Sequence, residues 1–492
     1  MKLFKLLIVT MIILGWSFAN GQRLEGNIWT LQECVDYAIE NNLTIARDRL
    51  SVQNSEVTLQ QNKAGIYPTL NAGAGTGFNW GRSIDPTTND FITQRIGTTG
   101  FSANSSVILF NRFNLQNRVR QSKVDLEASK RDLEKTRNDI LFGVISLYTS
   151  VIFNKELLEN AKSQLNSIVQ QVDRTQKQVN AGALPKSNLL NLLSQQATIE
   201  LNIVNAENNL NFVLLQLKQL LQIPATDPFD IEIPEIDVET TPIIDITAQE
   251  VYQLAVQSLP EVKSADLGVE SSLLGMEISK AGFFPMLRLN AGMGTNYSDA
   301  RTSLTLSDGT SNPIDLDNDG INDTQSIGFV QGTNQTVLTE IRVPNFTTRE
   351  FDFSTQLDEN LTQNIGLNLS IPIFNGLQAR SNLQRSIITN KQAEITAEQV
   401  RNTLRQNIEN AYNDVYAASK SYAQSLVQVE ALEESFRITE QRYNLNAVSF
   451  VDYQVASDNL FQASSDLLRA KYDYIFKQKI LDFYQGKTLS FN

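Results

Sequence analysis

The sequence predicts an α+β protein, mainly α, in which long coiled-coil helices and two β-hairpins occur as a tandem duplication. Three observations predict this class. Residues 112–222 and 376–486 align without a gap at a constant offset of 264. Each of these segments carries about 70 residues of helical heptad pattern. A proline-led segment of alternating apolar and polar residues precedes each of them.

The heptad pattern predicts the long helices. In the first copy, apolar residues recur at every seventh position, at Val119, Leu126, Leu133, Ile140 and Leu147. This period is typical of a coiled coil. A helix of about 70 residues is about 100 Å long, which is too long for one compact core. Such a helix therefore needs neighbours along its whole length.

Each long helix is followed by a break and a shorter helix. The breaks fall at 180–185 and 444–449, where Gly182 in the first copy aligns with Asn446 in the second. Gly and Asn are the residues that most readily adopt the left-handed conformation that ends a helix. We expect a turn between antiparallel helices, with Pro185 as the first residue of the return helix. A kinked continuous helix is the alternative.

Composition argues against most enzyme chemistries. The chain has 492 residues, with 41 Lys and Arg, 54 Asp and Glu, one cysteine and no histidine. The commonest general base and metal ligand is therefore missing, and Cys34 alone can form neither an internal disulfide nor a thiolate zinc site. Carboxylate chemistry remains open. The net charge of −13 also argues against nucleic-acid binding.

Residues 1–21 have the pattern of a signal peptide. Two lysines precede the apolar run Leu6–Leu14, and the small residues Ala19 and Gly21 follow it. A membrane anchor is the alternative, but the apolar run is too short to span a bilayer. The rest of the chain divides into a first repeat, 22–246, and a second repeat, 247–492.

Each repeat opens with a predicted helix, at 30–66 and at 247–283. Both have a capping box, in which an N-cap threonine is followed three residues later by glutamate. The boxes are Thr30 with Glu33 and Thr247 with Glu250. Between the repeats, residues 223–246 are acidic and rich in proline, so we expect an irregular connector there.

The hairpins are predicted at 69–110 and 286–374, where the period of the pattern changes to two. Leu287, Leu289 and Ala291 alternate with polar residues and glycine over about 10 positions. This length and period fit a membrane β-strand, and equally a half-buried strand of a soluble sheet. Four strands are too few to close a barrel, and an open edge in lipid leaves backbone groups unpaired. In a membrane, several chains would therefore have to share one barrel.

The loop of the second hairpin, 298–360, contains alternating carboxylates at Asp315, Asp317 and Asp319 before Gly320, and a further carboxylate, Asp323, after it. Such spacing is typical of a calcium-binding loop. The twelfth position from Asp315 is Ser326 rather than glutamate, so an ordinary EF-hand is not expected. Calcium at this loop and a merely solvated acidic loop both remain open, and no other cofactor is expected.

The order of these elements resembles the TolC-like family of outer-membrane efflux proteins. Phe-Asn precedes each long helix, at Phe110-Asn111 and Phe374-Asn375. The resemblance extends over the whole chain after the signal peptide. It implies a homotrimer whose 12-stranded β-barrel in the outer-membrane lipid continues into a 12-helix periplasmic tube. It further implies a passive export duct of a tripartite efflux or type I secretion system, opened by a periplasmic adaptor and an inner-membrane pump of RND or ABC type.

The resemblance also implies a gate at the periplasmic helix ends. Tyr443 matches a family tyrosine near the gate, and Asp452 matches the first of two inward aspartates. Val455 occupies the position of the second aspartate, and Val448 that of the gate arginine. Asn188 stands where some members carry an acidic residue. Three copies of Asp452 would form a ring that favours cations, although a solvated helix-surface residue remains the alternative.

The two turns are the candidate docking surface for the adaptor, because exposed small residues at a hairpin tip suit packing against another helical hairpin. Ordinary turn chemistry would explain them equally. The residues are Gly182, Ala183, Pro185, Asn446, Ala447 and Ser449. As a function of another class, a soluble coiled-coil scaffold without a pore would also explain the heptads and the acidic charge.

Overall fold

The computed structural model describes residues 28–84, 91–93, 95–234, 246–315, 322–333, 335–445 and 447–487. The predicted signal peptide lies outside these residues. The chain forms two compact units, which we name the helical unit and the strand unit. The helical unit comprises the residues up to Gln60, Val119–Met276 and the residues from Gln384 onward. The strand unit comprises Gln61–Arg118 and Glu277–Leu383.

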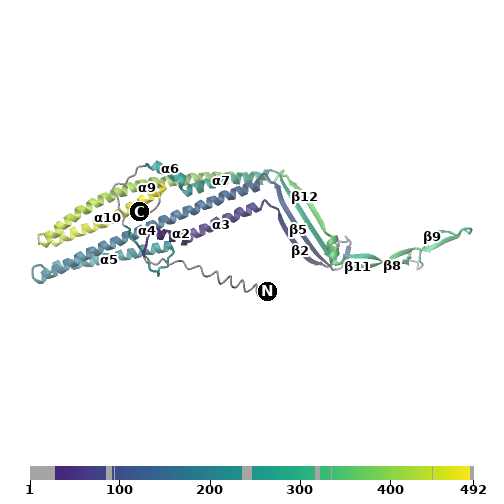
Figure 1. Ribbon diagram of the computed structural model, residues 1–492, viewed down its shortest axis with the longest axis horizontal. Coiled ribbons are helices and arrows are strands. Elements are labelled where there is room, and N and C mark those ends of the chain that lie inside the picture. Colours follow the sequence, from purple (N-terminus) through teal and green to yellow (C-terminus); the bar gives the residue numbers. More distant parts are fainter. Residues whose placement is uncertain are drawn as a thin grey trace. The chain divides into compact units, whose positions relative to one another are not determined.

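The helices follow the predicted duplication (Figure 1). They are α2 (Leu31–Asn41), α3 (Leu43–Ala64), α4 (Asn114–Asn180), α5 (Lys186–Leu221), α6 (Ala248–Ser258), α7 (Pro260–Lys280), the short 3₁₀ helix η1 (Ala281–Phe283), α8 (Phe353–Glu359), α9 (Gln378–Asn444) and α10 (Phe450–Tyr484).

The two long helices, α4 and α9, each contain 67 residues and begin and end at equivalent positions. Each stops before a turn, after which the shorter helix α5 or α10 begins. The predicted helix–turn–helix is therefore confirmed, and the kinked continuous helix is wrong. Among the described helices, α4 alone has a stretch apolar and long enough to cross a bilayer. Of that stretch, 33% is buried within the structure.

The predicted helices 30–66 and 247–283 are each broken, which corrects the expectation of continuous helices. Asn42 has extended backbone between α2 and α3, and its side-chain Oδ1 accepts from the Thr44 amide at 2.8 Å, so it caps α3. Leu259 is extended at the equivalent break, because Pro260 disfavours helical geometry in the preceding residue. Both predicted capping boxes are present.

Strands form most of the strand unit, and Figure 1 shows β2, β5 and β12, which belong to one sheet. Two short strands, β1 (Ile28–Trp29) and β6 (Asp230–Ile231), lie in the helical unit. The strands of the strand unit are β2 (Thr69–Asn79), β3 (Arg82–Ile84), β4 (Phe91–Thr93), β5 (Ile96–Phe110), β7 (Met286–Ser298), β8 (Thr302–Pro313), β9 (Thr324–Phe329), β10 (Thr336–Glu340), β11 (Arg342–Glu350) and β12 (Thr362–Ser370).

The main sheet is antiparallel and has the order β12-β7-β5-β2, so both predicted hairpins are present and pair with each other. The register of the paired strands places apolar residues together on one face of the sheet and polar residues and glycine on the other. Leu289 lies opposite Leu367 on β12 and Val107 on β5. On the other face, Asn104 lies opposite Asn71 and Gly292, and Gly292 lies opposite Asn364. One face is therefore apolar and the other is rich in asparagine and glycine.

Two predicted irregular segments contain regular structure. The segment 298–360 forms two-stranded ribbons, β8 with β11 and β9 with β10, followed by α8. In the connector, β6 pairs in parallel with β1, and the Tyr148 hydroxyl donates to the Glu232 carbonyl at 2.7 Å. The connector is therefore held to β1 by backbone pairing and to α4 by the Tyr148 hydroxyl, while its residues 235–245 lie outside the described part.

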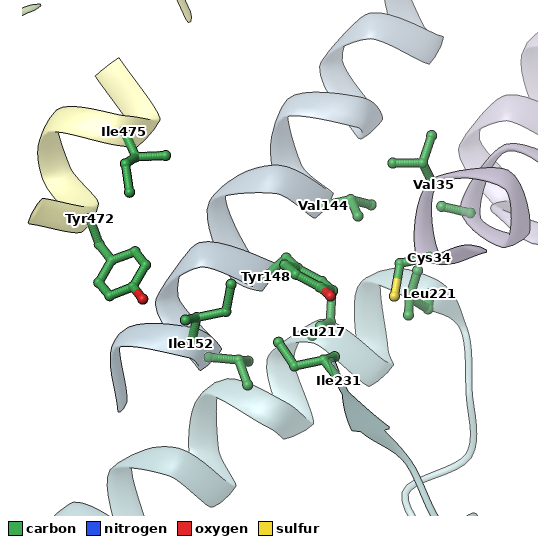
Figure 2. Packing of buried hydrophobic residues seen from close by; sticks show 12 residues of the cluster. Cys34, Val35, Val144, Tyr148, Ile152, Leu217, Leu221, Ile231, Tyr472 and Ile475 are labelled. Atoms are coloured by element: carbon green, nitrogen blue, oxygen red, sulfur yellow. The ribbon is translucent and has the colours of Figure 1, made fainter. Parts of the chain in front are cut away.

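The core of the helical unit has three apolar clusters along the helices. The largest gathers side chains of α2, α4, α5, β6 and α10 around Cys34, Tyr148 and Leu217, and Figure 2 shows these side chains pointing toward one another. A second cluster joins α6, α9 and α10 around Ile408 and Tyr474. The third lies near the helix turns and forms part of the candidate site.

Candidate functional site

The turn after α4 is closed by backbone hydrogen bonds of the Schellman type. The Ala183 amide donates to the Gln178 carbonyl at 2.9 Å, and the Gly182 amide donates to the Val179 carbonyl at 3.0 Å. Gly182 has a φ of 73°, which favours glycine. Gly182 and Ala183 are exposed at this turn.

The turn after α9 is closed by an equivalent backbone hydrogen bond. The Ala447 amide donates to the Arg442 carbonyl at 2.8 Å, at positions equivalent to the bond between Ala183 and Gln178. Ala447 is exposed, as the docking prediction requires, but Asn446 lies outside the described residues. The role of both turns in docking stays a prediction.

The return helices begin with different caps at equivalent positions. Pro185 is the N-cap of α5 and not its first residue, so the helix begins at Lys186, one residue later than predicted, and the extended backbone of Pro185 (ψ 146°) lies outside the helix. Its ring fixes φ but leaves ψ free, so a proline can end the turn as well as begin the helix. Ser449 is the N-cap of α10, and its hydroxyl accepts from the Asp452 amide at 3.2 Å.

Asp452 completes a capping box. Its Oδ2 accepts from the Ser449 hydroxyl at 2.7 Å and from the Ser449 amide at 3.0 Å. These bonds from Ser449, with a smaller contribution from the positive charge of Arg442, lower the pKa of the Asp452 carboxyl. The side chain is exposed, so Asp452 presents an ionised carboxylate near the turn at neutral pH.

Tyr443 lies in the third apolar cluster, where the two helix pairs meet. Its ring stacks on that of Tyr453, with centroids 5.0 Å apart, and lies 6.2 Å from that of Phe450. The cluster also contains Ile168 of α4 and Leu192 of α5. The buried Tyr443 hydroxyl has no hydrogen-bond partner among the described residues. Tyr443 therefore acts here through packing of its ring.

The other predicted gate residues divide between the surface and the cluster. Val448 packs against the third cluster, while Val455 is exposed. Asn188 is half-buried in the first turn of α5, and its amide donates to the Pro185 carbonyl at 3.1 Å. The structure thus brings Tyr443 and Val448 together and leaves Asp452 and Val455 on the surface.

Several polar contacts between the helix pairs were missed by sequence reasoning. Gln195 Nε2 donates to Asp458 Oδ1 at 3.2 Å, and Asn160 Nδ2 donates to Ser465 Oγ at 3.5 Å. Arg174 donates to the side chain of Asn444, the last residue of α9. The place of Tyr453 in the third apolar cluster could have been predicted, because it lies three residues after Phe450 and therefore on the same face of α10. The polar pairs join residues far apart in sequence and carry no local signal.

The predicted calcium loop is described only at its ends. The Asp323 amide donates to the Ile314 carbonyl at 2.9 Å, which brings the two ends together. Asp317 and Asp319 lie outside the described residues, and the described part of the chain contains no cluster of metal-ligating residues. Calcium binding by Asp315 and Asp323 with these two residues stays a prediction.

Comparison with solved structures gives the class of fold. The chain superimposes on a crystal structure of CusC with a TM-score of 0.73 and 16% identity, over 96% of both chains. It also matches the outer membrane protein VceC of Vibrio cholerae with a TM-score of 0.73 and 13% identity, over 94% of this chain and 97% of that one. The fold is that of TolC-like outer-membrane channels.

Sequence comparison gives the family. The family model "Outer membrane efflux protein" matches residues 34–221 and 345–486, so the chain belongs to this family. It is 21% identical to the outer membrane protein TolC of Escherichia coli (strain K12), over 69% of this chain and 59% of that protein. It is 23% identical to the cation efflux system protein CusC of Escherichia coli O157:H7, over 89% and 82% of the two. The protein is therefore an outer-membrane protein of a family that carries out no catalysis.

Proposed function

We propose that three copies of the chain form one passive channel, in which a 12-stranded barrel in the outer membrane continues into a 12-helix tube in the periplasm. The channel would export solutes of a tripartite efflux or type I secretion system. Family membership supports this function and argues against a soluble coiled-coil scaffold.

The observation that carries the proposal is the open four-stranded sheet. Its edge strands β2 and β12 each pair on one side only within the described chain, and both are exposed along their whole length. An unpaired edge in lipid costs several kcal/mol for each backbone group. Closure by copies of the same sheet would satisfy both edges, and three copies would supply twelve strands.

The two faces of the sheet fit such a barrel. The apolar face, with Leu289, Leu367 and Val107, would contact lipid. The opposite face carries Asn71, Asn104 and Asn364 at one level of the register and would line the aqueous lumen. Three copies would place nine asparagines at this level, which offers a polar and uncharged wall to solutes.

The tip would hold the channel closed until partners engage it. Packing of Tyr443, Phe450 and Tyr453 between the helix pairs would hold the tip closed, since Val448 and Val455 stand where the resemblance places a gate arginine and a second aspartate. A periplasmic adaptor would dock on the exposed turns and, with an inner-membrane pump of RND or ABC type, would favour a second packing of the helices. The ring of three Asp452 carboxylates at the mouth would favour cations.

The test is the oligomer mass of the detergent-purified protein together with its conductance in a planar bilayer. We expect the mass of a trimer and a small conductance in which cations carry more current than anions. Replacing Tyr443 by alanine should raise the conductance, because the packing that closes the tip is lost. A monomer that stays in solution without detergent and conducts no ions would refute the proposal.

A further inference from the structure

Helix α4 of the first repeat lies against helix α7 of the second repeat within the same chain, and we name this contact the closed seam. The Ser271 hydroxyl donates to Asp125 Oδ1 at 2.5 Å, and the Ser264 hydroxyl donates to Asp132 Oδ1 at 2.6 Å. The two contacts are seven residues apart on both helices. They therefore set the register of an antiparallel pair along one face of each helix.

The duplication supplies a second set of the same two faces. Helix α3 is the copy of α7 at an offset of 217, and α9 is the copy of α4 at an offset of 264. Within each repeat the paired helices also correspond. The Ser55 hydroxyl lies 3.0 Å from that of Ser129 between α3 and α4, and Ser272 of α7, the copy of Ser55, donates to Asn390 of α9 at 2.9 Å.

The face of α3 that corresponds to the closed seam, and the positions of α9 directly before the copies of the seam aspartates, carry exposed apolar residues at heptad spacing. On α3 these are Leu43, Leu50 and Val57, and on α9 they are Ile388 and Ile395. Their exposed fractions range from 49% for Ile388 to 68% for Leu43. In the closed seam, the copies of Leu50 and Val57 are Leu267 and Leu274, and both are at least half-buried.

We propose that this α3 face binds the α9 face of a second copy of the chain, in the register of the closed α4–α7 seam. The register pairs Asn54 of one copy with Thr389 of the other, as equivalents of Ser271 and Asp125. It likewise pairs Arg47 with Thr396, as equivalents of Ser264 and Asp132. The inference rests on the proposed trimer and specifies which residues meet at its helical interface.

Four double-cysteine variants test this register in the full-length protein. Asn54→Cys with Thr389→Cys and Arg47→Cys with Thr396→Cys are the matched pairs. Asn54→Cys with Thr396→Cys and Arg47→Cys with Thr389→Cys use the same four residues but are displaced by one heptad, which is about 10 Å. A disulfide needs Cβ atoms within about 4.5 Å, so only matched pairs should react.

Two controls keep the result interpretable. Asp125→Cys with Ser271→Cys should form a disulfide within one chain, because these residues touch in the closed seam. The native Cys34 can remain, because its thiol is buried and burial raises its pKa to about 12, which leaves little reactive thiolate.

Under mild oxidation we expect covalent dimers and trimers from the matched pairs and none from the displaced pairs or single-cysteine variants. If the displaced pairs cross-link as well, or the matched pairs fail while the internal control forms, the inference is wrong. The oligomer mass of the same samples separates the two proposals, because a trimer with the wrong register leaves the proposed channel intact. A second variant, Leu50→Glu with Val57→Glu, should lower the trimer fraction, whereas Leu201→Glu on the exposed part of α5 should not.

Discussion

At the scale of single residues, the tip of the second repeat combines a structural role and a charge in one side chain. Asp452 caps α10 through Ser449 and also presents an exposed carboxylate. In the first repeat, Pro185 and Asn188 occupy the same two positions, so that tip has neither a side-chain cap nor a charge there. The two tips of one chain therefore differ electrostatically, although equivalent backbone hydrogen bonds close both turns.

The two roles of Asp452 can be separated by a pair of variants. Asp452→Asn removes the charge and keeps an oxygen that can accept from the Ser449 hydroxyl. Ser449→Ala keeps the charge and removes the cap, which costs about 1 kcal/mol of helix stability. We expect the reversal potential in a salt gradient to shift toward lower cation selectivity in Asp452→Asn and to stay unchanged in Ser449→Ala. Equal shifts in both variants would contradict a charge-based role.

The cap should weaken at low pH. The pKa of Asp452 is lower in the folded protein than in the unfolded chain because Ser449 donates to the carboxylate. Its stabilisation is therefore present above the ordinary aspartate range, about pH 4, and is lost as pH falls through the folded pKa. Amide hydrogen exchange of residues 449–453, corrected for intrinsic rates, should accelerate on acidification in the wild type. The Asp452→Asn variant should show no such pH dependence.

Gln222 occupies a left-handed position that the second repeat fills with Gly486. Their φ angles are 63° and 78°, and equivalent backbone bonds close both helix ends. In this conformation a residue with a side chain is about 1 kcal/mol less stable than glycine. Part of this cost is offset, because the side chain lowers the conformational entropy of the unfolded chain. Gln222→Gly should therefore raise the midpoint of thermal unfolding slightly, at a fixed scan rate. Gly486→Gln should lower it, although its side chain would enter open space.

At the scale of elements, the break between the first two helices of each repeat has a different chemical cause in the two repeats. Asn42 breaks the first helix by capping α3 with its side chain, whereas Leu259 breaks the second because proline follows it. The heptads, the capping boxes and the long helix ends were predictable, because each depends on residues a few positions apart. The break at Asn42 was not, because asparagine also fits a helix surface and only its tertiary surroundings select the cap.

The strand pattern predicted the two faces of the main sheet, since cross-strand neighbours share one face. It left open whether the apolar face meets lipid, and one pair of variants on β12 tests this. Leu367→Arg should destabilise the barrel by about 2–4 kcal/mol if that face lies at the centre of the bilayer. Asn368→Arg, on the opposite face, should be tolerated. The measurement is the folded fraction in lipid vesicles, by heat-modifiable gel mobility, and equal losses would contradict the assignment.

The candidate site was only partly predictable at this scale. Tyr443 and Val448 meet in one cluster, as proximity to a common tip suggests. The contacts of Gln195 with Asp458 and of Asn160 with Ser465 join helices separated by more than 200 residues. Such pairs depend on how two helical hairpins lie against each other, and a single sequence gives no local pattern for that.

At the scale of the whole molecule, the duplication means that two kinds of seam would alternate around a closed ring of helices. The α4–α7 seam joins aspartate to serine inside one chain. The proposed seam between chains would join threonine to asparagine or arginine instead. A closed ring of three chains would thus contain two kinds of helix contact, the α4–α7 contact within each chain and the α3–α9 contact between chains. A mutation could weaken one kind of contact without changing the other. Such a channel could widen with threefold symmetry, because the helices could rotate at one kind of contact while the other kind stays packed.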